Sequence, residues 1–169
     1  DTNSRFHQLF KNCPQCGKKL LHDENNVSCE ACSETWYNNP APATSIALIK
    51  DGKILLAKRK VEPEKGKWDI LGGFVEAGES IEDAVIREMK EETNLDVEIT
   101  EYLGSVADIY GGKPSLPILY KVKMADENQT PNPQDDVEEL AWFSTSEIPK
   151  NLAFKNVEVI IEKIKKDLV

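Results

Sequence analysis

The spacing of apolar residues predicts a sheet in the part of the chain that follows residue 43. Thr44–Ile49 and Lys53–Ala57 are apolar segments of strand length, and Asp51-Gly52 between them is a dipeptide typical of a tight hairpin turn. Three further segments have the composition of strands, namely Val97–Val106, Pro117–Met124 and Leu140–Phe143. We therefore expect a sheet that begins with a hairpin.

Two segments show the three- and four-residue apolar spacing of amphipathic helices. The first covers about residues 80–93, and Ser80 and Asp83 stand in capping-box spacing at its start. The second covers about residues 156–168 and carries a single apolar stripe, which we expect to pack into the core. The stretch Asp126–Asp136 is rich in Asn, Pro and Asp and is predicted to be a polar loop.

Length and composition limit the classes of protein that fit. The 169 residues, 40% hydrophobic and 30% charged, can bury one core of ordinary size beside a small appendage. The longest apolar stretches, Ile46–Ile49 and Ile54–Ala57, are far shorter than the roughly 20 residues that span a bilayer, so no membrane partner is predicted. No basic segment followed by an apolar run opens the chain, so we expect a cytoplasmic protein without a secretory signal.

The formal net charge of -9 bears on the partner. Nucleic acids are usually held by a broad basic surface that neutralises phosphates, so this balance argues against a nucleic-acid partner. A small anionic ligand remains compatible with the charge if divalent cations stand between the ligand and the protein.

All four cysteines lie near the N-terminus, as the C-x-x-C pairs Cys13/Cys16 and Cys29/Cys32. Each pair can turn a tight knuckle onto one ion, and two knuckles complete a tetrahedral zinc site. Disulfides are the alternative, but they need an oxidising compartment that nothing else in the sequence supports. We interpret residues 1–37 as a zinc ribbon whose zinc is structural, because cysteine fills all four coordination positions.

A short connection follows the predicted ribbon. Residues 38–42 include Pro40 and Pro42, each of which restricts the backbone of the chain around it. The sequence therefore predicts a domain boundary at residues 38–42 and a second domain over residues 43–169.

The helix predicted at residues 80–93 carries carboxylates on its apolar face. At about 100° per residue, Glu88 and Glu92 project into the middle of that face, and Glu91 lies at its margin. Ionised carboxylates against a core are costly unless cations or hydrogen bonds compensate. Two compensations are open: paired Lys or Arg side chains, or a divalent ion such as Mg²⁺ or Mn²⁺, which prefers carboxylate oxygens.

A glycine-rich turn, Leu71–Glu79, leads into the same helix. Glycines let the main chain approach a ligand closely, and a helix N-terminus favours anions. The turn and the carboxylate helix together are typical of a site that holds metal ions and a phosphate.

These residues resemble the signature of the Nudix hydrolases, G-x5-E-x7-R-E-U-x-E-E-x-G-U, in which U is aliphatic. The matching residues are Gly73, Glu79, Arg87, Glu88, Met89, Glu91, Glu92 and Leu95. Asn94 stands where the family has glycine, and Leu71 replaces a proline that commonly precedes the two glycines. Because Asn tolerates the left-handed conformation, we expect the turn after the helix to be kept. The resemblance extends over nearly all of residues 40–169.

The resemblance implies an α/β fold, an α/β/α sandwich with a mixed sheet, preceded in this chain by the four-cysteine ribbon. It also implies that Glu88, Glu91 and Glu92 bind catalytic Mg²⁺ or Mn²⁺ together with the carbonyl of Gly72. Gly73 would support the site from the turn.

The resemblance further implies an enzyme that hydrolyses a diphosphate linkage. Glu79 and Arg87 would form a salt bridge that orients the turn. Glu91 is the first candidate for the general base, and Glu138 or Glu139 is the candidate outside the signature.

A zinc ribbon joined to such a domain is similar to the architecture of the NADH pyrophosphatases and their relatives. This similarity implies a nucleoside diphosphate derivative as substrate, of the ADP-ribose, NADH or nucleotide-sugar type. The segment S-Q-P-W-P-F-P-x-S that marks the NADH enzymes is absent, so the particular substrate is left open. Phe74 and Tyr110 are candidates for stacking on a nucleobase, although isolated aromatic residues more often serve packing.

The class that competes with an enzyme is a non-catalytic Nudix-fold sensor or adaptor, whose zinc ribbon contacts a protein or RNA. This alternative predicts the loss of signature carboxylates, whereas Glu88, Glu91 and Glu92 are all present. Many members of the family are dimers, so the resemblance also implies a homodimer.

Overall fold

The computed structural model describes residues 2–168, with the side chains described from Arg5 onward. The chain divides into two compact units. The first holds the residues up to Pro40 together with Gly112–Pro114, and the second holds Ala41–Gly111 and the residues from Ser115 onward. Each unit has its own core, so the two are described separately.

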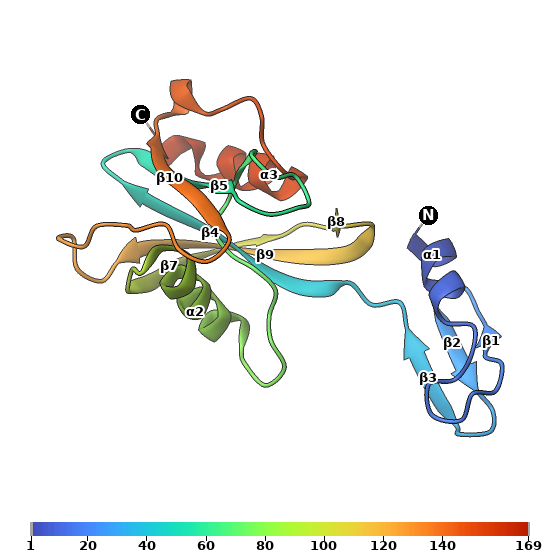
Figure 1. Ribbon diagram of the computed structural model, residues 1–169. Coiled ribbons are helices and arrows are strands. Elements are labelled where there is room, and N and C mark those ends of the chain that lie inside the picture. Colours follow the sequence, from blue (N-terminus) through green and yellow to red (C-terminus); the bar gives the residue numbers. More distant parts are fainter. Residues whose placement is uncertain (1, 169) are drawn as a thin grey trace. The chain divides into compact units, whose positions relative to one another are not determined.

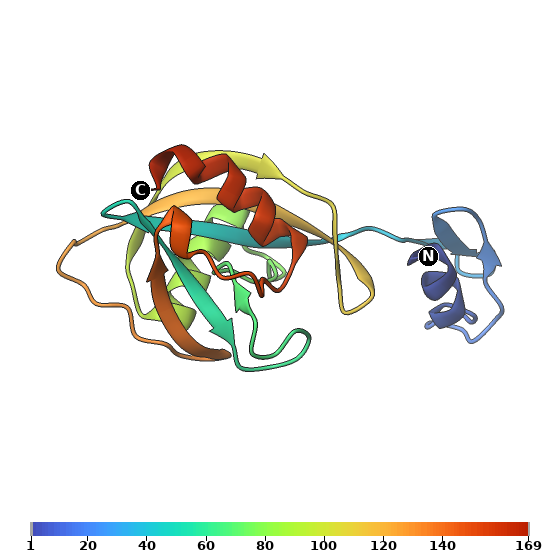
Figure 2. The ribbon, with the colours of Figure 1, turned by 90° about the horizontal axis from the view of Figure 1, so that it is seen from above.

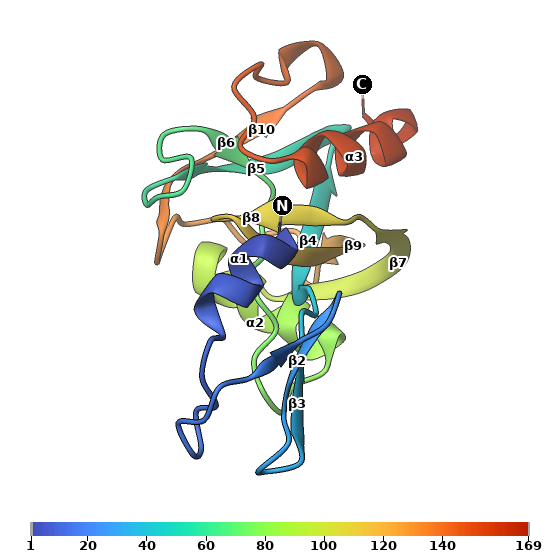
Figure 3. The ribbon, with the colours of Figure 1, turned by 90° about the vertical axis from the view of Figure 1, so that its right-hand side faces the viewer.

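The first unit combines one helix with a small antiparallel sheet (Figure 3). Its elements are α1 (Thr2–Leu9), β1 (Leu21–His22), β2 (Asn26–Cys29) and β3 (Glu34–Tyr37), and the strand order is β1-β2-β3. The residues buried in its core are Cys13, Leu20, Val27 and Cys29. Two of these four are cysteines, so apolar burial alone contributes little to the stability of this unit.

The second unit is built on a seven-stranded mixed sheet. Its strands are β4 (Ala41–Lys50), β5 (Lys53–Arg59), β6 (Trp68–Asp69), β7 (Val97–Ser105), β8 (Asp108–Tyr110), β9 (Lys113–Met124) and β10 (Val137–Phe143). The main order is β10-β5-β4-β9-β7, with β6 on β5 and β8 on β9. Strands β4 and β9 run parallel, whereas β4–β5, β5–β10 and β7–β9 are antiparallel.

Helices α2 (Ile81–Thr93) and α3 (Lys155–Ile164) cover opposite faces of this sheet (Figures 1 and 2). Alternate residues of each strand point to opposite faces. Ile46 and Leu55 accordingly belong to the core under α2, while Ala47 and Ile54 belong to the core under α3. The predicted α/β/α sandwich with a mixed sheet is confirmed.

The predicted helices and strands are present, with shifted ends. The apolar stripe of α3 is buried in the core, but the α-helix stops at Ile164 and a 3-10 turn, Lys165–Asp167, continues it. A second 3-10 turn covers Thr145–Glu147. Strand β4 starts at Ala41, inside the stretch predicted as a connection, because Ala41 and Pro42 pair with β9 in parallel register.

Sequence reasoning missed several short elements. Strands β6 and β8 and helix α1 have too few residues for an apolar period to show. Both strands form by pairing with longer strands, β6 with β5 and β8 with β9. Their positions depend on neighbours that are distant in the sequence, which a local pattern does not contain.

Candidate functional site

The glycine-rich turn lies against β4 and α2 and is held there by its main chain. Ile46 N–H donates to the carbonyl of Leu71 at 2.8 Å, and Thr44 N–H donates to the carbonyl of Gly73 at 2.8 Å. Gly72 has a φ of 127°, and a Cβ there would collide with the Thr44 carbonyl. A Cβ on Gly73 would lie 2.5 Å from Glu88 Oε1. The close approach of turn, strand and helix therefore requires both glycines.

Helix α2 begins and ends as its sequence predicts. Ser80 is the N-cap, and its side chain accepts a hydrogen bond from Asp83 N–H at 3.1 Å. Asn94 closes the helix with a φ of 58°, and its N–H donates to the Lys90 carbonyl at 2.9 Å. The expectation that asparagine would keep the left-handed turn is confirmed.

The two carboxylates expected on the apolar face of α2 are buried: Glu88 is 9% exposed and Glu92 is 7% exposed. Burial raises the pKa of Glu92 well above its ordinary value, and a hydrogen bond from Gly72 N–H to Oε2, 2.9 Å long, opposes that rise. Burial also raises the pKa of Glu88, against the effect of Arg87. The negative field of Asp136 adds to both shifts.

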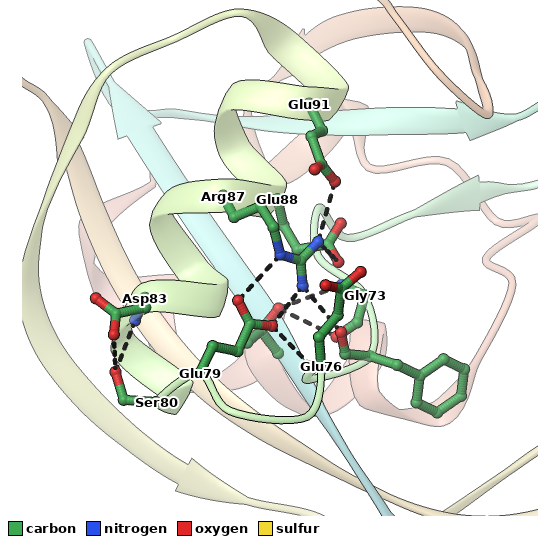
Figure 4. Close-up of polar contacts among 10 residues, drawn as sticks. Gly73, Glu76, Glu79, Ser80, Asp83, Arg87, Glu88 and Glu91 are labelled. Atoms are coloured by element: carbon green, nitrogen blue, oxygen red, sulfur yellow. Dashed lines mark hydrogen bonds and ion pairs between the residues drawn. The ribbon is translucent and has the colours of Figure 1, made fainter.

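Arg87 gathers the remaining carboxylates of the signature (Figure 4). Its Nη2 and Nε atoms lie 2.7 and 3.1 Å from the Glu79 carboxylate, so the expected salt bridge is present. Its Nη1 atom also pairs with Glu88 at 2.8 Å and with Glu91 at 3.0 Å, and Nη2 donates to the Phe74 carbonyl. The hydrogen bonds that Glu79 accepts from Arg87 and from Glu76 N–H lower the pKa of Glu79. An arginine therefore provides part of the compensation that the buried carboxylates need.

The carboxylate oxygens of Glu88, Glu91 and Glu92 are not all within 4.8 Å of one another. In the part of the chain that the structure describes, only the four cysteines bring three or more candidate ligand atoms within 4.8 Å of one another. Neighbouring carboxylates repel each other, and one oxygen of Glu88 and one of Glu91 accept hydrogen bonds from Arg87.

A cavity of about 400 Å³ opens beside α2, and Glu88, Glu91 and Glu92 line one side of it. Asp135 and Asp136 line it as well, and sequence reasoning missed both. Their loop is fastened to the end of α2, because Asn132 and Gln134 N–H donate to the carbonyls of Thr93 and Glu92 at 2.9 and 3.0 Å. The feature of the sequence that could have pointed to them is their position as an acidic pair directly before β10.

Glu139 lies away from this cavity. It is not among the lining residues, its side chain is 54% exposed, and its carboxylate is 3.6 Å from Lys58 Nζ. A bulge between Val137 and Glu139 shifts the register of β10 against β5 at this point. The geometry therefore favours Glu91 over Glu139 as a group that reaches a ligand.

The other side of the cavity is aromatic and contains a buried ion pair. Phe74 and Tyr110, both named from the sequence, line it together with Phe154, which sequence reasoning missed. Arg59 and Asp69 form the ion pair, with Nη1 2.8 Å from Oδ2. Burial raises the pKa of Asp69 to about 6, although Arg59 opposes that shift. No motif pointed to this pair, because Arg59 and Asp69 meet only through the pairing of β5 with β6.

The cysteines of the first unit form a compact cluster. Cys13 Sγ lies 3.9 Å from Cys32 Sγ, and Cys16 Sγ lies 3.6 Å from Cys29 Sγ. In a tetrahedral zinc site with Zn–S bonds of about 2.3 Å, sulfur atoms are about 3.8 Å apart. The cluster therefore fits a four-cysteine zinc ion and uses all of its coordination positions.

The fold and the site together define a Nudix domain preceded by a cysteine cluster. The family model described as NUDIX domain matches residues 39–163. Because this match covers well over half of the chain, the chain belongs to the Nudix family.

Two relatives illustrate the similarity. An ADP-ribose pyrophosphatase from Methanocaldococcus jannaschii is 39% identical over 128 residues, which cover 73% of each protein. A NAD-capped RNA hydrolase, NudC, from Vibrio atlanticus is 29% identical over 166 residues, which are 94% of this chain and 60% of the relative. The chain thus spans little more than half the length of such NudC relatives.

Among solved structures, a NUDIX hydrolase from Nitrosomonas europaea superposes with a TM-score of 0.76 at 26% identity, covering 93% of this chain and 91% of that one. A MutT NUDIX hydrolase from Burkholderia pseudomallei gives a TM-score of 0.68 at 30% identity, covering 75% of this chain and 98% of that one. Over the described residues, no helix is long and apolar enough to cross a membrane.

Proposed function

We propose that this chain hydrolyses the diphosphate linkage of a nucleoside diphosphate derivative, of the ADP-ribose, NADH or nucleotide-sugar type, with Mg²⁺ or Mn²⁺. The observation that carries this proposal is the burial of Glu88 and Glu92 beside a cavity, within a signature whose carboxylates are all present. The ADP-ribose pyrophosphatase relative supports the substrate class.

The donor set suits a hard divalent cation. We assign the Mg²⁺ or Mn²⁺ ligands to the carboxylates of Glu88, Glu91 and Glu92 and to the carbonyl of Gly72. When bound, such ions neutralise diphosphate oxygens and lower the pKa of a water molecule. The hydrogen bond from Gly72 N–H to Glu92 and that from Arg87 to Glu88 orient these two carboxylates.

Within this site the chain must also accept a proton from the attacking water. Glu91 is our proposed base, since it lines the cavity and its side chain is 49% exposed. Asp136 is a second carboxylate at the same cavity, on a loop fixed to α2. Glu79 and Arg87 position the turn and touch no reacting atom in this scheme.

A non-catalytic sensor or adaptor is the alternative function. It is disfavoured because such a protein has no need to keep the carboxylates of Glu88 and Glu92 buried against a core. Binding of capped RNA, suggested by the names of the NudC relatives, is disfavoured by the net charge of -9.

A structural zinc ion in a ribbon over residues 1–37 is supported by the sulfur geometry, and the hydrolase domain would then cover residues 43–169. We further propose a homodimer, as the family resemblance implies. We also propose a cytoplasmic location, because cysteines that hold a metal ion need a compartment that keeps thiols reduced.

A substrate screen tests the proposed hydrolysis. Product formation is measured by chromatography, with Mg²⁺ or Mn²⁺, against ADP-ribose, NADH, NAD, FAD, nucleotide sugars, diadenosine polyphosphates and nucleoside triphosphates. The Glu92→Gln variant should lose the activity, and Glu98→Gln, which changes an exposed glutamate on β7, should keep it. Ligand binding without turnover of any compound by the zinc-loaded protein would favour the sensor.

A further inference from the structure

Thr44 carries a buried hydroxyl group that no step of the proposed hydrolysis uses. The residue lies on β4, is 3% exposed and lines the cavity. Its Oγ1 atom accepts a hydrogen bond from Gly73 N–H at 3.2 Å and donates to the carbonyl of Gly73 at 3.3 Å. One side chain of β4 therefore contacts both main-chain polar groups of a glycine in the turn.

The turn runs antiparallel to β4, in the manner of a further strand. An isolated antiparallel bridge joins Ala43 to Phe74, and the same register places Gly73 opposite Thr44. In a regular antiparallel ladder, the two residues of a hydrogen-bonded pair exchange two main-chain bonds. The first of these bonds is present, because Thr44 N–H donates to the Gly73 carbonyl at 2.8 Å.

The second bond of this pair has a different acceptor. Gly73 N–H donates to the hydroxyl of Thr44 instead of to its carbonyl. The turn leaves the ladder at this point, because Gly72 has a φ of 127° and its N–H donates to Glu92 Oε2 at 2.9 Å. The hydroxyl of Thr44 thus replaces a main-chain acceptor where the chain departs toward α2. Without the hydroxyl, a partly buried N–H group would lose its partner.

The same hydrogen bond sets the direction of the Gly72 carbonyl. This carbonyl and Gly73 N–H belong to one peptide group, which is trans, so the two groups point in opposite directions. While the Thr44 hydroxyl holds the N–H, the carbonyl oxygen of Gly72 points away from that hydroxyl. Rotation of this peptide would change the direction of both groups together.

We propose that Thr44 is a positioning residue whose hydroxyl holds the Gly72–Gly73 peptide so that the Gly72 carbonyl is presented to the divalent cation. The inference rests on the proposed function, which assigns that carbonyl as a ligand. Mg²⁺ tolerates little deviation from octahedral geometry, so a rotated carbonyl should weaken its binding. Because the departure from the ladder also directs Gly72 N–H to Glu92, the hydroxyl supports two of the assigned ligands.

Amide hydrogen exchange of the metal-free site tests the hydrogen bond itself. Measured by NMR on the full, zinc-loaded chain, Thr44→Val should raise the exchange rate of Gly73 N–H at least about 10-fold. Thr44→Ser keeps a hydroxyl and should stay within about threefold of wild type. Ser45→Ala is the matched control, because it removes a buried hydroxyl that Asn156 contacts on the opposite face of β4. Unchanged exchange in Thr44→Val would overturn the inference.

Mn²⁺ affinity tests the presentation of the carbonyl. Electron paramagnetic resonance measures free Mn²⁺, and the binding that Glu92→Gln removes is assigned to this site. Thr44→Val should weaken this binding about 10-fold, whereas Thr44→Ser and Ser45→Ala should match wild type. Equal affinity of Thr44→Val and wild type would overturn the inference, as would equal weakening in all three variants. Thermal unfolding checks each variant, and Thr44→Cys, with a weaker hydrogen-bonding group, replaces Thr44→Val if the latter does not fold.

Turnover separates this inference from the proposed function. If ADP-ribose is hydrolysed, Thr44→Val should raise the Mn²⁺ concentration for half-maximal rate about 10-fold. If no diphosphate is hydrolysed while Mn²⁺ affinity still depends on the Thr44 hydroxyl, the hydrolysis fails and the positioning role stands. Hydrolysis with the same Mn²⁺ requirement in wild type and Thr44→Val would overturn the positioning role alone. A wild type that binds no Mn²⁺ at this site would overturn both the ligand assignment and the positioning role.

Discussion

At the scale of single residues, the site is organised by burial of charge. Glu88 and Glu92 are carried into a core face by the helical period, and each keeps one specific partner there, Arg87 and Gly72 N–H respectively. Because burial raises the pKa of both carboxylates, protons and metal ions compete for them. A carboxylate pair of this kind is more useful for holding a cation than for stabilising the fold.

Gly73→Ala should disable the site with limited harm to the fold. The added Cβ would stand 2.5 Å from Glu88 Oε1, so that carboxylate must move. We expect the kcat/KM of diphosphate hydrolysis to fall about 100-fold. Glu98→Gln, an exposed substitution on β7, is the control for activity, and thermal unfolding checks that Gly73→Ala folds. Equal activity of the two variants would show that hydrolysis does not depend on the position of the Glu88 carboxylate.

Asp69→Asn should change how stability depends on pH. The folded-state pKa of Asp69 is about 6 against an ordinary 3.8, so the folded protein binds this proton more tightly than the unfolded chain. Its stabilising effect is complete below about pH 4 and is lost as pH rises to about 6, a change of about 3 kcal/mol. The free energy of unfolding of wild type should fall by that amount relative to Asp69→Asn, measured by urea denaturation across the window. Parallel curves would contradict the raised pKa.

Several site residues could be predicted from the sequence because their signal is local. Glu88 and Glu92 follow from the period of one helix, and their burial is confirmed. Asp136, Arg59 and Phe154 could not be found in this way. They reach the cavity through strand pairing and through a loop fastened to the end of α2, which are long-range contacts.

At the scale of elements, α2 is positioned by its ends as much as by its apolar face. Ser80 stops it on the side of the glycine turn, and Asn94 turns the chain toward β7. The carbonyls of Glu92 and Thr93 are taken by the loop that carries Asp135 and Asp136. One helix terminus therefore places two sets of carboxylates at one cavity.

Substitution of Asn94 measures the cost of that turn. Its φ of 58° suits glycine and strains alanine. Asn94→Gly should leave the free energy of unfolding unchanged or raise it by up to about 1 kcal/mol, and Asn94→Ala should lower it by about 1 kcal/mol. Chemical denaturation of both variants gives the comparison. An alanine variant as stable as the glycine variant would contradict the left-handed end.

At the scale of the whole molecule, the chain combines a unit with an ordinary apolar core and a unit built around four cysteines. The division into a ribbon and a mixed-sheet domain could be proposed from cysteine spacing and apolar runs. Helix α1 could not, because eight residues of mostly polar character give no clear period. The small core of the first unit also predicts that its stability depends on the metal.

Zinc removal should unfold the first unit and leave the second folded. The purified chain should contain one zinc ion, and a chelator should abolish amide protection in β2 and β3 while protection in β4 and β5 persists. Hydrogen exchange measures both units in one experiment, and Cys16→Ser should reproduce the effect without chelator. Protection of β2 and β3 that survives zinc removal would contradict a structural zinc.

The most direct test of the central claim is the metal dependence of ADP-ribose hydrolysis by wild type and Glu92→Gln. The structure predicts turnover that requires Mg²⁺ or Mn²⁺, stops with a chelator of these ions, and falls at least about 100-fold in Glu92→Gln. Glu98→Gln, at an exposed pair with Lys123, should match wild type. Hydrolysis that persists without divalent ions, or that survives the loss of the Glu92 carboxylate, would contradict the assignment of this buried helix face as the catalytic site.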